Sequence, residues 1–406
     1  MTITQSSTSP SVHDLVREIT AQSKLPLETA VPLPTRTYWD HDFYELELEN
    51  IFRKDWVCIA RCEEVPDPGS YLAVDLANEP LIVVRGDDKK VRVFSRICRH
   101  RYEDLLGGQR DPQERRSGCV ERFECPYHAW TYRLDGSLLN APDMWSRPSF
   151  DAEAFGLRQI NTHVWQGFVF VNLDEQTPFP FDMSGIERVQ GNYDFTDWRL
   201  AANIAWGDST ANWKIMVENF SEAYHHIGAH MSSAQEMWPL GSVEIGDERG
   251  GEWFYSRMHV AAAAAVDEVD GHLIQPTWLP SQKGLSPYER SQGLLVLKFP
   301  TFMLLPAPDV TFWFRATPTG PETHHLDIAL MVPKSNLAAP DFDRLITEAV
   351  DFFRPIQAED ASVNEKIQST AKSQYSSGGV LHVHEQPLWQ LQKYLASRLP
   401  ASSTAY

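Results

Sequence analysis

Cys98-Arg-His100 and Cys125-Pro-Tyr-His128 decide the fold of this chain, because they place two thiols and two imidazoles in two short patches separated by 24 residues. Such a set could hold one tetrahedral zinc ion, or a [2Fe–2S] cluster with sulfur ligands on one iron and nitrogen ligands on the other. Each patch supplies one Cys and one His, so two similar loops could clamp a two-iron unit from opposite sides. A zinc site more often draws its ligands in like pairs, and the order of the residues therefore favours the cluster.

The residues that flank these patches point to a particular domain. Arg101 follows the first patch, and Ala129-Trp130-Thr131-Tyr132 follow the second, ahead of a turn at Asp135-Gly136. In this form the sequence closely resembles the Rieske [2Fe–2S] domain. The resemblance implies that the cluster ligands are Cys98, His100, Cys125 and His128.

Two features depart from the Rieske pattern. The interval between the patches is longer than usual by several residues, and the excess is the polar run at 109–118, which we interpret as a surface insertion. Ala129 stands where the family often has glycine, which bears on the local backbone but not on the ligands. The sequence assigns no role to the insertion or to Cys119 beside it.

Length and composition indicate a globular protein of two domains. The chain has 406 residues, of which 42% are hydrophobic and 22% charged, so it can bury sizeable cores. It lacks the long apolar run that a membrane span needs and shows no secretory leader, so we expect a cytoplasmic protein. The net charge of −19 argues against a nucleic-acid partner, whose phosphates require a basic surface.

The expected organisation changes twice along the chain. Residues 1–48 form an N-terminal arm that contains a helix near 12–22. Residues 49–175 are short alternating apolar runs separated by turns, which predicts the all-β Rieske domain with the cluster loops at its tip. Residues 176–406 combine strand-like runs with helices at 341–353 and 358–369. This predicts a catalytic domain of helices on an antiparallel sheet (helix-grip, START-like), and the fold class is α+β.

A second cluster of possible metal ligands lies between Asn212 and His230. Two histidines and one carboxylate on one face of an iron leave positions for O2 and substrate. His226 and His230 are four residues apart and would share a helix face, whereas His225 and His230 are about 140° apart on an ideal helix. The latter pair converges only if the helix loosens, for which Gly228 offers a place. Helical geometry therefore favours the 226/230 pair, or no metal.

A resemblance reverses that order. Glu222-x-x-His225-x-x-x-x-His230 matches the acid-x-x-His-x-x-x-x-His signature of the Rieske non-haem iron oxygenases, and the upstream Glu-Asn-Phe that contains Asn219 is similar to the same family. The resemblance implies that His225 and His230 bind a mononuclear Fe(II). It leaves His226 as a bystander.

The same resemblance implies a third ligand and a route for electrons. The run from Gln357 to Gln368, which contains Glu359-Asp360, is similar to the family's C-terminal helix, in which the aspartate binds iron, so Asp360 is assigned rather than Glu359. Glu222 and Asn219 are assigned catalytic roles. Glu222 is expected to bridge an iron-ligand histidine and a Rieske histidine of a neighbouring subunit. This role requires a head-to-tail ring, expected to be a homotrimer, and a β subunit is not excluded.

The implied function is that of a terminal oxygenase component, which uses O2 as co-substrate. The sequence has no G-x-G-x-x-G loop, so NAD(P)H is expected to act only through a separate reductase or ferredoxin. The motifs favour an aromatic or related ring compound as substrate. The alternative is a monooxygenase or N-demethylase of a betaine- or carnitine-type quaternary ammonium compound. An electron-transfer Rieske protein without oxygenase activity is the alternative from a different class.

Aromatic residues gather in the region expected to line the substrate pocket. They could stack on an aromatic ring or surround a trimethylammonium group by cation–π attraction. Packing in the core of the sheet explains more than half of them equally well. The candidates are Trp238, Trp253, Phe302, Phe312 and Phe314.

Overall fold

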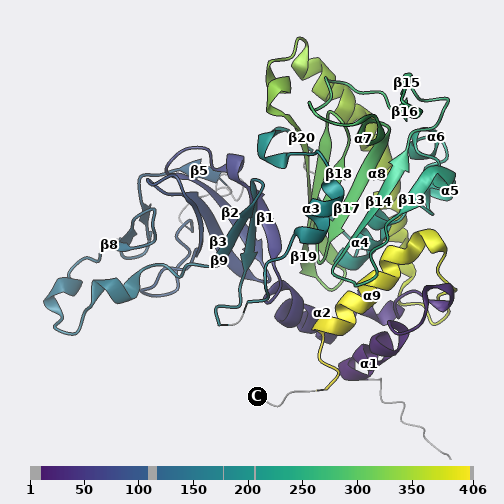
Figure 1. Ribbon diagram of the computed structural model, residues 1–406. Coiled ribbons are helices and arrows are strands. Elements are labelled where there is room, and N and C mark those ends of the chain that lie inside the picture. The colour runs from purple at the N-terminus through teal and green to yellow at the C-terminus, as the bar shows by residue number, and fades with distance from the viewer. Residues whose placement is uncertain (1–10, 108–116, 177, 205–206, 403–406) are drawn as a thin grey trace, which may run out of the picture. The chain divides into compact units, whose positions relative to one another are not determined.

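The computed structural model describes residues 11–107, 117–176, 178–204 and 207–402. It divides the chain into two compact units, a smaller one at Phe52–Phe181 and a larger one that joins Met1–Ile51 to Asp182–Tyr406 (Figure 1). Of the insertion predicted at 109–118, only Ser117 and Gly118 fall within the described residues. None of the helices in the described ranges combines the length and apolar character needed to cross a membrane.

The smaller unit is built from short antiparallel strands, as the alternating runs predicted. One sheet pairs β1 (Val57–Arg61), β10 (Phe168–Asn172) and β9 (Asn161–Trp165). A second sheet has the order β4 (Val91–Ser95), β3 (Glu79–Arg85), β2 (Ser70–Leu76) and β5 (Ser117–Cys119). A third pairs β6 (Phe123–Glu124), β7 (Thr131–Tyr132) and β8 (Leu138–Asn140). Phe94, Trp130 and Tyr132 belong to a buried core that also contains Cys98 and Cys125.

The N-terminal segment belongs to the larger unit, although the sequence analysis set it apart as an arm. Its first helix, α1 (Val12–Gln22), begins at a capping box of Ser11 and Asp14 and packs against α9 (Gln386–Arg398). The second, α2 (His41–Glu47), continues into a π-helical turn at Leu48–Phe52. The apolar side chains on one face of α1 are buried. The helix therefore packs against α9 instead of projecting into solvent.

A large antiparallel sheet forms the centre of the larger unit. The strand order is β11 (Trp198–Asn203), β20 (Thr323–Pro333), β19 (Thr311–Gly320), β18 (Phe302–Pro306), β17 (Gln292–Lys298), β14 (Trp253–His259) and β13 (Val243–Ile245). The short β12 (Gly207–Ser209) also pairs with β20. A separate hairpin joins β15 (Asp267–Val269) to β16 (His272–Ile274).

Helices pack around this sheet, which confirms the α+β class. The longest, α8 (Phe342–Thr370), is one continuous helix where the sequence suggested two, and it runs through Pro355. Buried residues on both sides of the proline, Phe353 and Gln357, hold the helix together there, at the loss of one backbone hydrogen bond. The others are α3 (Ser184–Gln190), α4 (Trp213–Ser221), α5 (His226–Ala229), α6 (Ala234–Met237) and α7 (Pro287–Arg290).

A buried ion pair ties the N-terminal segment to α4. Lys214 Nζ lies 2.8 Å from Glu47 Oε1, and neither side chain is exposed. Trp213 Nε1 donates to the other oxygen of Glu47 at 3.1 Å. Burial raises the pKa of Glu47 and lowers the pKa of Lys214, each opposed by the charge of its partner. The sequence Asn212-Trp213-Lys214 therefore begins α4 and anchors it in one step, since Asn212 also caps the helix.

We expect Lys214→Met to lower the free energy of unfolding by about 3–5 kcal/mol, because it leaves the Glu47 carboxylate buried without a counter-charge. Urea unfolding of the purified protein measures this loss. The double variant Lys214→Met/Glu47→Gln removes both charges and should recover most of the stability. An unchanged unfolding midpoint in the single variant would contradict the importance of the pair.

Candidate functional site

The two cysteine loops of the smaller unit are closed by the same backbone hydrogen bonds. Cys98 N–H donates to the carbonyl of Glu103, five residues later, and Cys125 N–H donates to that of Trp130, both at 2.8 Å. The carbonyl of each cysteine in turn accepts an N–H from the residue four positions on. The β6–β7 hairpin carries the second loop. The two patches are thus two copies of one local design, as their similar sequences suggested.

Both loops also contain one residue with a left-handed backbone at the same position. These residues are Tyr102, with φ of +62°, and Ala129, with φ of +55°. Glycine adopts such angles without a steric penalty, whereas a residue with a Cβ atom does so at a cost. This explains why the family often has glycine at 129. Ala129 adopts the same left-handed conformation as Tyr102 in the first loop, despite its Cβ atom.

The four candidate cluster ligands are two buried cysteines and two histidines whose buried Nδ1 atoms lack partners among the described residues. Cys98 and Cys125 are buried, and the rings of His100 and His128 lie 4.6 Å apart between centroids. The Nδ1 atoms of both histidines are buried and accept or donate no hydrogen bond within the described residues. Buried polar atoms are almost always satisfied, and bonds to a cluster iron would satisfy these two. The donor set therefore fits a [2Fe–2S] group.

Tyr132 completes the surroundings of the first sulfur. Its hydroxyl accepts the backbone N–H of Arg99 at 3.0 Å and lies 3.3 Å from Cys98 Sγ. Because the oxygen already accepts one hydrogen bond, its own proton is free to point at the sulfur. Burial raises the pKa of the Cys125 thiol, so a positive ion is needed to hold that sulfur as a thiolate.

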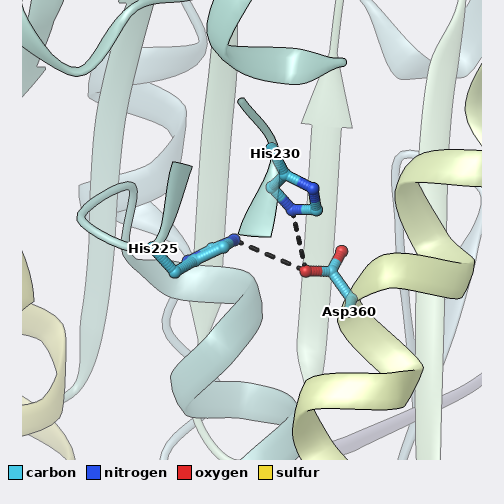
Figure 2. Close-up of side chains that lie close together, drawn as sticks. All are labelled: His225, His230 and Asp360. Carbon is cyan, nitrogen blue, oxygen red and sulfur yellow. Dashed lines mark hydrogen bonds and ion pairs between the residues drawn. The ribbon is translucent and has the colours of Figure 1, made fainter. Parts of the chain in front are cut away.

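The larger unit brings His225, His230 and Asp360 together. Their ligand atoms lie within 4.8 Å of one another, and no other group of three such residues was found in the described ranges (Figure 2). His230 Nε2 lies 2.9 Å and His225 Nε2 3.4 Å from Asp360 Oδ1. The His230 side chain is 1% exposed, and the other two are largely buried. Two imidazoles and one carboxylate, with space beside them, fit a mononuclear iron.

A break in the helical structure allows residues five positions apart to converge. α4 ends at Ser221, and the chain is not helical again until α5, which is one turn long. His225 directly precedes α5 and His230 directly follows it. The loosening expected at Gly228 is wrong, because Gly228 lies inside α5 and the irregular segment comes before it. His226 lies outside the triad, with Nδ1 3.2 Å from the Trp238 carbonyl oxygen.

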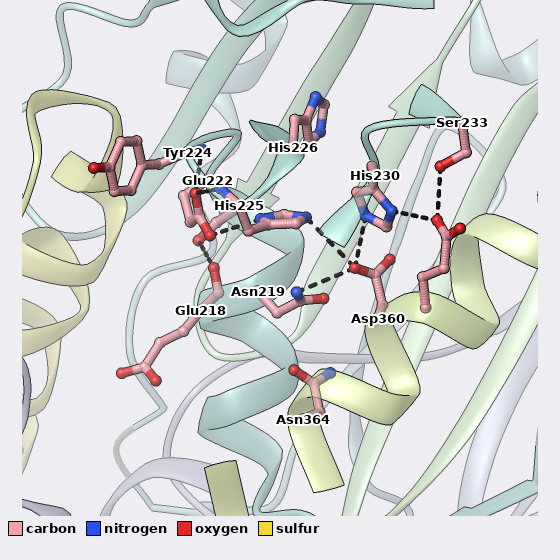
Figure 3. A network of polar contacts seen from close by, with 12 residues as sticks. Glu218, Asn219, Glu222, Tyr224, His225, His226, His230, Ser233, Asp360 and Asn364 are labelled. Atoms are coloured by element: carbon pink, nitrogen blue, oxygen red, sulfur yellow. Dashed lines mark hydrogen bonds and ion pairs between the residues drawn. The ribbon is translucent and has the colours of Figure 1, made fainter. Parts of the chain in front are cut away.

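A carboxylate orients each histidine of the triad. His225 Nδ1 lies 2.6 Å from Glu222 Oε1, and His230 Nδ1 lies 2.7 Å from Glu359 Oε2 (Figure 3). Each Nδ1–H donates to its carboxylate, which fixes the tautomer and leaves Nε2 free to bind a metal. The sequence analysis passed over Glu359. An acidic residue beside the predicted ligand was the available signal for this role.

The carboxylates at the site favour positive charge there, carried by protonated histidines or by a metal that replaces the Nε2 protons. Burial alone would raise the pKa of Asp360, but hydrogen bonds from His225 and His230 lower it to about 2. Burial would likewise lower the pKa of His225, but hydrogen bonds to Asp360 and Glu222 raise it to about 10. Asn219, from α4, donates to Asp360 Oδ1 at 3.1 Å. Asp360 therefore remains ionised and is held in place by a neutral neighbour.

A cavity lies beside the triad, and three of the five predicted pocket residues line it: Trp238, Phe312 and Phe314. Trp253 and Phe302 do not. Strand residues alternate between the two faces of a sheet, and the pairing of β18 with β19 puts Phe302 opposite Arg315 while Phe314 pairs with Met303. Phe302 is thus on the other face, as is Trp253, which alternates with the cavity-lining Met258 on β14.

The sequence analysis missed an aromatic corner of this cavity. The ring of Phe352 lies 5.4 Å from that of Trp278 and 6.4 Å from that of Trp238, between centroids. All three side chains line the cavity. Phe353, the next residue of α8, stacks on Phe312 at 4.1 Å. The sequence did contain a signal for these residues. Counting back from Asp360 in steps of three or four residues along α8 leads to the aromatic residues on the same helix face.

Comparisons with known proteins match both parts of the chain. Residues 195–401 match the family described as ring hydroxylating alpha subunit (catalytic domain), and residues 55–151 match the Rieske [2Fe-2S] domain. The chain is 29% identical to the glycine betaine monooxygenase oxygenase subunit of Pseudomonas aeruginosa, over 61% of this chain and 56% of that protein. It is 32% identical to the carnitine monooxygenase oxygenase subunit of Escherichia coli K12, over 50% and 53%.

These matches span about half the length of the curated relatives. A solved structure extends the likeness to nearly the whole chain. The crystal structure of a quaternary ammonium Rieske monooxygenase in complex with L-carnitine aligns with a TM-score of 0.72 and 25% identity, covering 93% of this chain and 99% of that one.

Removing one triad ligand should change the metal content in a defined way. We expect about three iron and two sulfide per chain in the wild type, and about two of each in His225→Ala, whose visible cluster spectrum should be unchanged. His226→Ala is the matched control, since His226 is adjacent but outside the triad, and should keep all three irons. Iron loss from the control variant instead would show that the triad is assigned wrongly.

Proposed function

This chain belongs to the family of ring-hydroxylating oxygenase alpha subunits with a Rieske [2Fe–2S] domain, and we propose that it is the terminal component of an oxygenase system. The chemistry comes from two groups, a cluster that stores and passes single electrons and an iron that activates O2. An electron-transfer protein would have no use for the triad beside its substrate-sized cavity. That triad is the observation that carries the proposal.

In this proposal the side chains of the larger unit position and shield the reacting molecule. Asp360, His225 and His230 would hold the iron, and the substrate would bind in the cavity beside them. Glu222 and Glu359 keep both imidazoles in the tautomer that leaves Nε2 free. The aromatic and aliphatic wall excludes water from the reaction site.

We propose a quaternary ammonium compound as the substrate, rather than the ring compound that the motifs favoured. Among the described residues that line the cavity, the ones with ionisable side chains are acids and histidines, and none is lysine or arginine. Three aromatic rings at one corner could surround a trimethylammonium group by cation–π attraction. The names of the two curated relatives support the same class.

Electrons are proposed to come from a separate reductase or ferredoxin and to cross between copies of this chain. Glu222 Oε1 accepts a hydrogen bond from His225, and Oε2 accepts backbone N–H groups of Tyr224 and His225. A carboxylate offers about four lone-pair sites, so one remains for a Rieske histidine of a neighbouring copy. A closed head-to-tail ring, here proposed as a homotrimer, would bring that histidine to it.

Oxygen uptake by the purified protein with a reductase and NADH tests the substrate class. We expect L-carnitine, choline or glycine betaine to stimulate uptake and to yield an oxidised product, because the cavity suits a cation. Benzoate and salicylate should give no stimulation. The His225→Ala variant controls for uptake by the reductase alone. Stimulation by the aromatic acids and not by the ammonium compounds would contradict the proposal.

Glu222→Gln tests the bridge, with Glu359→Gln as its matched control. Both carboxylates orient a triad histidine, so both variants should weaken iron binding, by about 10–100-fold. Glu222→Gln alone should also slow reoxidation of the reduced cluster by O2 and substrate, measured in a single turnover and divided by bound iron. Equal rates per iron in the two variants would rule out the bridging role.

A further inference from the structure

Gln357 stands out among the residues that line the cavity. It lies on α8, its side chain is 2% exposed, and its Nε2 is buried without a hydrogen-bond partner. Other buried glutamines of the larger unit are bonded through Nε2, as Gln386 is to the carbonyls of Gly246 and Glu248. An unpaired buried amide costs free energy, and natural proteins retain few of them. Gln357 therefore calls for a partner that the chain itself does not provide.

The position of Gln357 connects the aromatic wall to the metal triad. Phe353, Gln357 and Asp360 are spaced by four and three residues on one helix, so they lie along one face of α8. Gln357 is about 4.5 Å along the helix axis from Asp360. On the N-terminal side of Gln357, Phe353 stacks on Phe312. All three residues line the cavity, so a ligand bound there is within reach of the aromatic wall, this carboxamide and the triad.

The two other carboxamides of the described cavity wall already donate to partners in the chain. Gln275 accepts from Trp238 Nε1 at 3.2 Å and donates to the Gln292 carbonyl at 3.1 Å. The Asn219 amide donates to Asp360. Gln357 is thus the carboxamide of the described lining whose N–H groups have no partner among the described residues.

We propose that the Gln357 carboxamide binds an uncharged oxygen of the substrate, a hydroxyl or a carbonyl, while the aromatic corner holds its trimethylammonium group. This inference rests on the proposed substrate class and narrows it. A carboxylate would find no lysine or arginine among the described residues that line the cavity, and would meet Asp309, Asp360 and Glu222. Gln357 is accordingly a substrate-binding residue that selects alcohols, esters or amides of quaternary ammonium compounds over betaines.

A pair of nearly isosteric ligands isolates this contact. Choline and propyltrimethylammonium differ only in that a hydroxyl of the first replaces a methyl of the second. Calorimetric titration of the anaerobic holoenzyme should show choline binding about fivefold more tightly, the value of one neutral hydrogen bond. In Gln357→Leu that preference should vanish, with propyltrimethylammonium bound as in the wild type. The melting temperature should be equal or higher, since an apolar side chain replaces an unpaired amide.

A second variant separates binding from folding. Gln386→Leu breaks hydrogen bonds outside the cavity, so it should lower the melting temperature and keep the preference for choline. An unchanged preference in Gln357→Leu, or glycine betaine binding more tightly than choline to the wild type, would overturn the inference while leaving the proposed function intact. Failure of all three ammonium ligands to bind would refute the proposed substrate class and this inference with it.

Discussion

One oxygen atom, Oδ1 of Asp360, connects α8 to α4 and to the segment that follows α4. It accepts contacts from His225 and His230 on the segment that follows α4, and from Asn219 on α4 itself. The two parts of the chain are about 130 residues apart in sequence, and no local preference could bring them together. The buried sheet sets the distance between α8 and α4. The polar contacts of Asp360 then set how the two helices are aligned along their axes.

Further buried polar contacts secure this arrangement eight residues beyond Asp360, near the C-terminal end of α8. The carboxamide of Gln368 accepts the backbone N–H of Asn212 at 2.9 Å and donates to the carbonyl of Tyr38 at 3.1 Å. It thereby links α8, the start of α4 and the N-terminal segment. The Glu47–Lys214 ion pair supports the same junction, because Lys214 is only two residues beyond Asn212. Rigid support of this kind is what a metal site needs, because its ligands must hold their geometry when the metal leaves.

The sequence predicted the parts of the site that depend on local spacing. The cysteine loops were identified because the same motif occurs twice, and the two loops repeat one backbone pattern, including the left-handed residue at Tyr102 and Ala129. The choice of His225 over His226 came from the family resemblance, since helical geometry alone favours the other pair. The irregular segment between α4 and α5 removes the premise of that geometric argument.

The remaining errors share a cause in long-range structure. Trp253 and Phe302 were placed in the pocket because aromatic residues cluster in the sequence, but which face of a strand is turned inward depends on pairing with its neighbours. Glu359 and Gln357 were assigned no role for a similar reason. Their partners lie on other elements, or in the ligand itself, and only the folded chain identifies them.

The shared face of α8 also limits how the cavity could be re-engineered. Since Phe353, Gln357 and Asp360 project from one helix, a replacement bulky enough to rotate or shift that helix would disturb the triad together with the cavity wall. Met258 and Leu295 border the same cavity from the paired strands β14 and β17. A library of variants aimed at a new specificity should therefore change the strand residues that line the cavity first and leave the α8 residues unchanged.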